Sequence, residues 1–443
     1  MERLYSILEI MKIKDIVRFH SETTTPIPDV VYHLYSLPSF DNNQTREELL
    51  GQDIQSNKFT VPNRCILFNK LNVRFKRIWR IDSDEDHKIA STEFLPLIID
   101  ENKVDFDYCF YLLASPAITD YLCGQNANTS GSHKRIDPTN FFNIGIKLPP
   151  LAQQYEIGKL LSSLDTKIKL NRQINQNLEA MAKQLYDYWF VQFDFPNEEG
   201  KPYKSSGGEM VWNEKLKRKI PNEWDNCKLK DFINLFDSKR IPLSSKDREE
   251  RKGNYPYYGA TGIMDYVNEY IFDGDYILLA EDGSTSDSKG FPIVQYIWGK
   301  NWVNNHAHII LPKNEQYLMF TYQMLRSIPA KQIETGSIQK KISQENLCEY
   351  NMVLPNSILI EKYESIISPL WEKRKLCIEE INALIKQRDE LLPLLMNGQA
   401  SVNSDLSVNK ERKSPLLNFK RCVRHLSPSS AIHNCFGQRI LDR

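Results

Sequence analysis

The chain has 443 residues, more than one hydrophobic core usually organises, so two or three domains are expected. Hydrophobic residues at 41% and charged residues at 26% exclude wholesale disorder and describe an ordinary globular chain. The 57 Lys and Arg residues balance 57 Asp and Glu residues, so net charge gives no global support for nucleic-acid binding, and any such evidence must be local.

Cysteines and apolar runs predict the compartment. The eight cysteines are scattered, without a Cys-x-x-Cys pair or a Cys/His cluster at zinc spacing, which favours free thiols in a reducing environment. No apolar run approaches the roughly 18 residues of a membrane span, and Met1 to Met11 are too charged and too few for a signal peptide. A cytoplasmic protein is predicted, with residues 1–11 as an N-terminal extension.

A basic stripe lies in the first predicted domain, residues 12–150, which reads as mixed α/β with a strand over 64–68. No acidic residue occurs between Asp53 and Asp82, while seven basic residues fall among four aromatic ones. Basic groups neutralise phosphates and aromatic rings can contact bases or sugars, so the stripe is a candidate nucleic-acid surface. A solvated basic face without a ligand is the alternative.

Two long helices are predicted over residues 151–190 and 356–397, because seam residues recur at alternating steps of four and three, the period of a coiled coil. The seams are Ile157, Leu161, Leu164, Ile168, Asn171, Asn175, Leu178, Ala182, Leu185 and Trp189, and Tyr363, Ile367, Leu370, Arg374, Cys377, Ile381, Leu384, Arg388, Leu391 and Leu395. Neither helix can bury its seam alone, so an antiparallel pair is expected. Packing on the globular domains as ordinary amphipathic helices is the alternative.

Polar and breaking residues refine the helix prediction. Asn171, Asn175, Arg374 and Arg388 occupy seam positions, where they would cost stability but fix register and partner choice. Pro369 is expected to kink or interrupt the second helix near its start, because proline removes a helix hydrogen bond. Gly398 is placed to end that helix.

A polar linker over residues 191–221 leads to a second mixed α/β domain over 222–355, with a strand over 276–280. The chain repeats itself here: Gly-Ser at 131–132 precedes Lys134-Arg135, and 205 residues later Gly-Ser at 336–337 precedes Lys340-Lys341. Each motif leads through a Leu-Pro pair into a long helix. The predicted fold is therefore mixed α+β, with two globular domains joined by two antiparallel coiled-coil helices in a pseudo-two-fold tandem repeat.

The sequence lacks the common motifs of catalytic sites. The sequence has no phosphate-binding Gly-x-x-x-x-Gly-Lys loop, no Asn-Pro-Pro-aromatic methyltransferase signature and no glycine-rich cofactor loop. His306 and His308 would face the same side of a strand, but no Cys or carboxylate lies at helpful spacing, so no metal site is predicted. Residues 398–443 read as a basic, disordered tail, since 401–443 hold eight Lys and Arg against three Asp and Glu.

A family resemblance is carried by WFVQFDFPNEEGKPYKSSGGEMVWNEKLKRKIPNEW, from Trp189 to Trp224, which resembles the central joining segment of type I restriction-modification specificity subunits. The segments LPPLAQQYEIGKLLSSLDTKI, YPYYGATGI, YIFDGDYILLAEDG, WVNNHAHIILP and LLPLLMNGQ are similar to that family as well. The resemblance implies two target recognition domains, each reading half of a split DNA sequence, with the helices setting the spacer.

The resemblance also implies partners: double-stranded DNA, two copies of a modification subunit on the helices, and restriction subunits. S-adenosylmethionine, ATP and Mg would belong to those partners, with no cofactor or catalytic chemistry in this chain. Candidate DNA-contacting residues are Lys70, Arg74, Lys76, Arg77, Lys134 and Arg135 in the first domain, and Tyr257, Asn305, His306, Gln339, Lys340 and Lys341 in the second. A self-contained methyltransferase or nuclease, and a stand-alone DNA-binding regulator that dimerises through the helices, are the competing functions.

Overall fold

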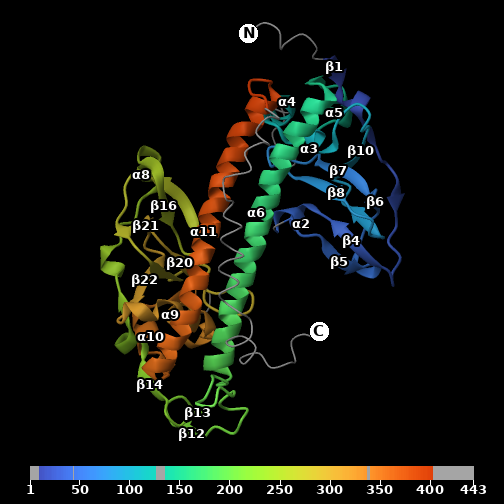
Figure 1. The fold of residues 1–443 in the computed structure, drawn as a ribbon. Coiled ribbons are helices and arrows are strands. Elements are labelled where there is room, and N and C mark those ends of the chain that lie inside the picture. The colour runs from blue at the N-terminus through green and yellow to red at the C-terminus, as the bar shows by residue number, and fades with distance from the viewer. Residues whose placement is uncertain (1–8, 43, 126–134, 337–339, 403–443) are drawn as a thin grey trace, which may run out of the picture. The chain divides into compact units, whose positions relative to one another are not determined.

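The computed structural model describes residues 9–42, 44–125, 135–336 and 340–402 (Figure 1). The described residues divide into two compact units, one made of residues up to 172 together with 378–402 and the other of residues 173–377. Each unit therefore holds one globular domain together with one end of each long helix. Within the described ranges, no helix is both long enough and apolar enough to cross a membrane.

The first domain is built on two stacked sheets. A four-stranded sheet has the order β2-β10-β7-β8, a five-stranded sheet has the order β3-β6-β9-β4-β5, and β1 pairs with β11. Only the β4–β9 pair is parallel among the described strands of this domain. The strands are β1 Glu9–Lys12, β2 Val17–Phe19, β3 Thr23–Thr24, β4 Val31–Tyr35, β5 Glu47–Leu50, β6 Lys58–Thr60, β7 Arg64–Asn69, β8 Ile78–Asp82, β9 Lys88–Ala90, β10 Phe94–Ile99 and β11 Gly145–Leu148.

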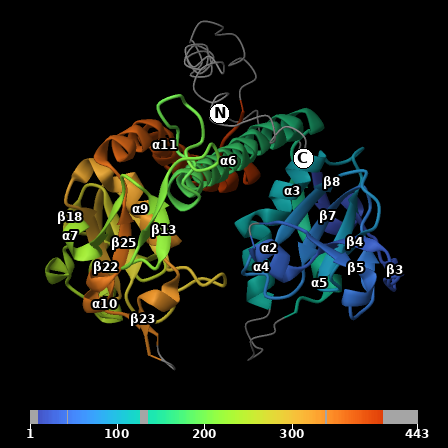
Figure 2. The ribbon, with the colours of Figure 1, turned by 90° about the horizontal axis from the view of Figure 1, so that it is seen from below.

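The central strand β7 shows why these layers form. Its side chains alternate between the two faces of the sheet, and all but Arg64 are buried. Ile66 and Phe68 belong to a core shared with helix α3, whereas Cys65 and Leu67 pack with residues of the second sheet. Figure 2 shows this domain from below. Its short helices are α1 Ile13–Ile16, α2 Leu37–Asp41, α3 Phe106–Ala114, α4 Pro116–Gln125 and α5 Pro138–Phe142, with a 3-10 turn at Gly51–Asp53.

The second domain repeats this arrangement. Its sheets have the orders β15-β22-β19-β20 and β17-β16-β21-β18, and β14 pairs with β25 as β1 pairs with β11. The parallel pair β16–β21 occupies the place of β4–β9. The strands are β14 Asp225–Lys228, β15 Ile233–Leu235, β16 Lys252–Tyr258, β17 Ile263–Val267, β18 Phe272–Asp273, β19 Tyr276–Ala280, β20 Val294–Ile297, β21 Lys300–Val303, β22 Ala307–Pro312, β23 Glu334–Thr335, β24 Lys341–Ile342 and β25 Asn351–Leu354.

Helices of the second domain complete the correspondence. The helices are α7 Leu229–Phe232, α8 Ser245–Glu250, α9 Leu318–Ser327 and α10 Gln344–Glu349, with 3-10 turns at Asp237–Lys239, Glu315–Tyr317 and Ala330–Gln332. Helix α7 follows β14 as α1 follows β1, which makes Leu235 at the end of β15 the counterpart of Phe19 at the end of β2. Pairing then carries the match inward, from Leu97 to Ile310 and from Ile66 to Ile277. The duplication predicted from the sequence extends to individual residues.

The long helices are α6 Leu151–Tyr186, continued by a π-helical turn over Asp187–Val191, and α11 Ser357–Met396. In the first unit, Leu164 and Ile168 form a cluster with Ile381 and Leu384. In the second unit, the Tyr363 hydroxyl donates to the Ala182 carbonyl at 3.2 Å. Residue numbers rise along α6 as those of their partners fall along α11, so the helices run antiparallel within each unit.

Three of the four predicted polar seam residues are paired across the two helices, whereas the side-chain oxygen of the fourth, Asn175, is buried without a hydrogen-bond partner. In the first unit the Asn171 amide donates to Glu380 at 2.8 Å, and Arg388 lies 2.8 Å from Asp165. In the second unit Arg374 lies 3.2 Å from Glu179. Because each pair is satisfied in one register only, a shift of either helix would leave half-buried charges without partners.

The interruption predicted at Pro369 is wrong. Helix α11 continues through this residue, because buried neighbours such as Tyr363, Ile367 and Trp371 anchor the helix in the second core. The ending predicted at Gly398 is correct: the glycine has φ +69°, and the N–H of Gln399 donates to the Leu394 carbonyl at 2.9 Å.

The segment 191–221, predicted as a linker, is folded. It contains the hairpin β12 Met210–Asn213 and β13 Arg218–Pro221. Phe195 stacks on Trp224 with ring centroids 5.0 Å apart, and both rings belong to the core of the second unit. Similarly, β1 places residues 9–11 inside the first domain rather than in an extension. Residues 1–8 and most of the predicted tail, 403–443, lie outside the described residues.

A buried carboxylate fixes α9 to α11 in the second unit. Glu364 accepts the backbone N–H of Phe320 at 2.7 Å, in the first turn of α9, and the Ser368 hydroxyl at 3.1 Å. Counting from the two helix starts, its counterpart in α6 is Gly158, where an added Cβ would lie 2.7 Å from the Asp105 carboxylate. Thus α3 and α9 each have a carboxylate at their N-terminus. In α3 it is Asp105 of the domain itself, and in α9 it is Glu364 of the long helix α11.

Burial raises the pKa of Glu364 to about 7, although hydrogen bonds from Phe320, Ser368 and Met319 act in the opposite direction. This value lies above the 4.5 of an unfolded glutamate, so the contribution of the protonated carboxyl to stability is lost as pH rises from about 4.5 through about 7. We expect Glu364→Gln, which keeps an acceptor for Phe320, to flatten the fall in thermal midpoint between pH 5.5 and pH 8.

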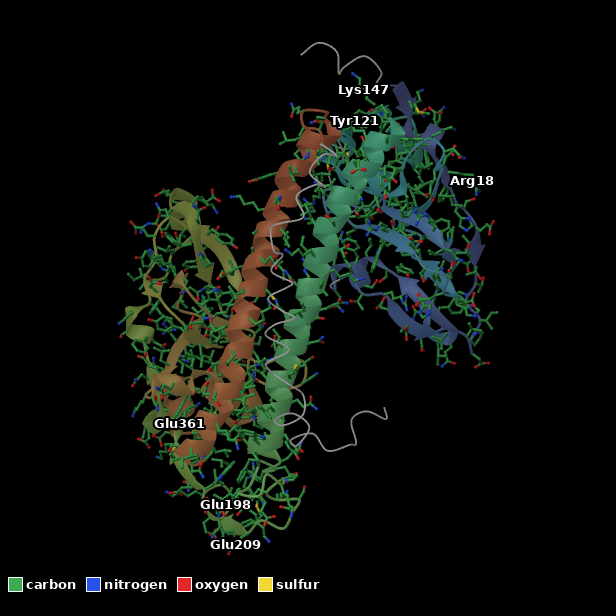
Figure 3. All side chains as sticks on the ribbon, in the orientation of Figure 1. Arg18, Tyr121, Lys147, Glu198, Glu209 and Glu361 are labelled. Carbon is green, nitrogen blue, oxygen red and sulfur yellow. The ribbon has the colours of Figure 1, made fainter. Side chains whose placement is uncertain are left out.

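The control for this prediction is Glu361→Gln, one turn earlier on α11 and exposed (labelled in Figure 3). Its pH profile should follow that of the wild type. Equal pH profiles for the wild type and Glu364→Gln would show that Glu364 does not titrate in this range.

Candidate nucleic-acid interface

One site recurs at equivalent places in the two domains. In the first, Arg135 forms an isolated β-bridge with Leu71, just beyond β7, and the Lys70 carbonyl accepts the Ile136 N–H at 2.9 Å. In the second, Lys341 bridges Asp282, just beyond β19, and the Glu281 carbonyl accepts the Ile342 N–H at 2.8 Å. We call Lys70, Leu71, Glu93 and Arg135 the first turn site, and Glu281, Asp282, His306 and Lys341 the second turn site.

Residue equivalence within the turn sites follows from the backbone. The Lys70 N–H donates to the Glu93 carbonyl at 2.9 Å, and the Glu281 N–H donates to the His306 carbonyl at 2.9 Å. Arg135 and Lys341, 206 residues apart, are therefore counterparts, as are Glu93 and His306. Within its own domain, each of these two basic residues lies beside the end of a central strand, β7 for Arg135 and β19 for Lys341.

The first turn site is a basic patch with one acid. The Arg135 guanidinium lies on Glu93, with Nε 3.0 Å from Oε2, and this hydrogen bond raises the pKa of Arg135. The Arg135 side chain keeps 60% of its surface exposed, against 20% for Glu93. A guanidinium held from one side with the other side open is suited to a bidentate contact with a phosphate or with guanine.

The second turn site carries more acids at the same positions. Lys341 Nζ lies 3.2 Å from Glu281, the counterpart of Lys70, so the charge at that position is reversed. His306 is exposed, with Nδ1 2.7 Å from the Asp282 carboxylate. Lys340 pairs with Glu334 at 3.1 Å. Carboxylates accept hydrogen bonds from base amino groups, so the two sites present different chemistry on the same backbone.

A buried ion network lies beneath the second turn site. His308 is fully buried, with Nδ1 2.6 Å from Asp237 and Nε2 2.8 Å from the Ile342 carbonyl. Both ring nitrogens face oxygen atoms, so His308 links Asp237, which follows β15, to the backbone of β24. Burial raises the pKa of Asp237, but His308 together with hydrogen bonds from the Ile309 N–H and the Gln344 amide leaves this pKa below its usual value.

Ligand atoms of Asp237, Glu281 and His308 lie within 4.8 Å of one another, the spacing of a metal site. Arg240 occupies that place instead: its Nη1 lies 2.7 Å from Glu281 and its Nη2 lies 3.5 Å from Asp237. A cation would meet the guanidinium at close range, so the cluster is an ion network in this structure. The two histidines that the sequence analysis paired have separate partners, His306 at the surface and His308 in the core.

The basic stripe of the first domain divides into two groups. Arg64 and Arg80 are held by acids, Arg64 by Asp82 and Glu101, and Arg80 by Asp107. Arg74 and Lys76 are exposed on the loop between β7 and β8. Arg77, on the same loop, is half-buried and pairs with Asp41 at 2.6 Å.

The other predicted contacts have mixed outcomes. Tyr257 is 1% exposed, and its hydroxyl accepts the Leu243 N–H at 3.0 Å, so it is a core residue and no longer a candidate. Asn305 is exposed, and its carbonyl accepts from Arg240 at 3.3 Å. Lys134 and Gln339 lie outside the described residues. Sequence reasoning missed Asp237, Glu281 and Arg240, which become neighbours only on folding.

Comparison with known proteins identifies the family. The family model for the type I restriction modification DNA specificity domain matches residues 7–180 and 221–380, so this chain belongs to that family. The specificity subunit of the type I restriction enzyme MjaIX from Methanocaldococcus jannaschii is 23% identical over 69% of this chain and 71% of its own length. The HindI specificity subunit from Haemophilus influenzae is 22% identical over 75% of this chain and 86% of its own.

A solved structure shares the fold. The type I restriction-modification system S subunit from M. genitalium superposes with a TM-score of 0.56 at 16% identity, covering 89% of this chain and 97% of that one. The fold class predicted from the sequence, two mixed α/β domains joined by two long helices, is confirmed. Neither a self-contained enzyme nor a stand-alone regulator is favoured by these comparisons.

Proposed function

We propose that this chain is the DNA-specificity subunit of a type I restriction-modification complex, in which each domain reads one half of a bipartite target. The observation that carries this proposal is the recurrence of one turn site on two equivalent backbones with different side chains. Arg135 and Lys70 offer donors in the first domain, whereas Asp282 and Glu281 add acceptors in the second. Two copies of a scaffold with unlike reading groups suit two unlike half-sites.

The subunit supplies recognition, and its partners supply the chemistry. Specificity subunits of this family assemble with modification and restriction subunits and bind DNA. We propose two modification subunits for each copy of this chain, because each of the two repeats combines one domain with one end of the helix pair and so offers one docking surface. S-adenosylmethionine, ATP and Mg are assigned to those partners. The helices, each of which runs through both units, would set the unread spacer of the target.

Replacing one domain tests the proposal. Because β1 pairs with β11, the exchanged segment should be residues 9–148, so that both strands come from the same donor. With residues 9–148 taken from a relative, adenine-methylation mapping in cells should show one half of the motif changed and the other retained. The reciprocal exchange of residues 225–354 should change the other half, since β14 and β25 close that domain. If either exchange altered both halves, independent reading would be refuted.

The exposed basic loop provides a second prediction. Changing Arg74 and Lys76 together to Ala should weaken binding and lower the slope of log affinity against log salt by up to about 1.8, since each lost phosphate contact removes about 0.9. Arg80→Ala is the matched control, because Arg80 is already paired with Asp107. A slope that stays the same in the double variant would assign the loop to a solvated face.

A further inference from the structure

Each domain presents one phenylalanine at the same place on its surface. Phe75 is 47% exposed and Phe291 is 37% exposed. Phe68 pairs with Ile78 across the β7–β8 hairpin, and its counterpart Leu279 pairs with Val294 across β19–β20. Each phenylalanine lies three residues before the second member of its pair. They are therefore counterparts, although one loop is longer than the other.

Both rings are held on ordered turns. The Phe75 N–H donates to the Asn72 carbonyl at 3.0 Å, and Asn72 has the left-handed φ of +52° that asparagine tolerates. The Phe291 N–H donates to the Asp287 carboxylate at 2.9 Å, after Gly290 with φ +82°. Both phenylalanine positions are thus set by the backbone, and ordering them on a ligand costs little entropy.

Cationic side chains contact the Phe75 ring, and two lysines lie on or beside the turn that carries Phe291. The guanidinium carbons of Arg74 and Arg77 lie 4.7 Å and 4.9 Å from the Phe75 centroid. Near Phe291, Lys289 is exposed. The residue after Phe291, Pro292, forms an isolated β-bridge with Ser286, and the Ser286 hydroxyl lies 3.5 Å from Lys340 Nζ. A single exposed apolar side chain needs no explanation, but two at equivalent positions beside cations fit a polyanion with flat apolar faces.

We propose that Phe75 and Phe291 are DNA wedges, each inserting its ring between two bases of the half-site that its domain reads. The cations would hold the neighbouring phosphates while the ring fills the opened step. The wedge would also loosen the stack beside the base that a modification subunit must extrude for methylation. This inference rests on the proposed function and adds two specific residues to it.

The test uses the complex with modification subunits and the target mapped by methylation, with 2-aminopurine placed in turn at the steps of each half-site. In the wild-type complex, 2-aminopurine fluorescence should rise at one base step in each half-site, because the probe is unstacked there. Phe75→Ala should lose the signal in the first half only, Phe291→Ala in the second only, with binding weakened about 5- to 100-fold and the salt slope retained. Phe75→Trp should restore signal and affinity.

Lys76→Ala is the matched control on the same loop: its salt slope should fall while the 2-aminopurine signal remains. Thermal midpoints equal to wild type for both Ala variants would exclude misfolding as the cause, as expected for exposed side chains. Wild-type affinity in both Ala variants, or a wild-type complex without any bright step, would overturn the inference. A wild-type complex that binds the mapped target no better than a scrambled duplex would instead refute the proposed function.

Discussion

Changing His308 to Ala is expected to lower the free energy of unfolding of the second domain by about 3–5 kcal/mol, the usual loss when one partner of a buried ion pair is removed. Asp237 is 8% exposed and would lose its nearest hydrogen-bond partner in the core. The Ile342 carbonyl would lose its donor as well, which loosens β24 beside Lys341. The same variant should therefore weaken the binding of the second domain to its half-site more than the binding of the first domain to its own.

Hydrogen exchange of the β19 and β22 amides measures this loss within the second domain, since unfolding of a two-domain chain is not a single transition. His306→Ala is the matched control: it lies two residues away, at the surface, and should change stability by less than about 0.5 kcal/mol. Equal protection of these amides in both variants would show that the network does not stabilise the domain.

Long-range periodicity is why the helices could be predicted. A seam that keeps its step over about 40 residues is visible in one sequence, and Leu164, Ile168, Ile381 and Leu384 pack together as that seam requires. Local rules failed where packing opposed them. Pro369 removes one helix hydrogen bond, but the buried side chains on both sides of it hold the backbone helical.

The candidate site could be predicted only in part. The repeat placed Arg135 and Lys341 at matched turns because both follow a Gly-Ser pair in the sequence. The sequence showed no sign of the partners in the ion network. Asp237, Glu281 and His308 are separated by 44 and 27 residues, and they meet only because β19 and β22 are neighbours next to the turn after β15. The prediction that Tyr257 contacts DNA is wrong for a related reason, because a tyrosine that contacts bases and one that packs in a core look alike in sequence.

Inserting four helix-forming residues into both long helices is expected to lengthen the spacer of the methylated target by one to two base pairs. The matched points are between Arg172 and Gln173 in α6 and between Cys377 and Ile378 in α11, where the two compact units divide. Four residues add roughly 6 Å and about 40° of rotation at 1.5 Å and 100° per residue. B-DNA advances about 34 Å in ten base pairs, which gives the expected change.

The two half-site sequences should stay the same in this variant, because no residue of either turn site is altered. Four residues break the heptad step, so some stability is lost, and a seven-residue insertion at the same points is the control that keeps the seam in register. The pairs Asn171–Glu380 and Arg374–Glu179 lie on opposite sides of the insertion, so each can still form within its own unit. Methylation mapping decides the result: a folded, active variant with the original spacer would leave the helices as a docking platform and remove their role in measuring the target.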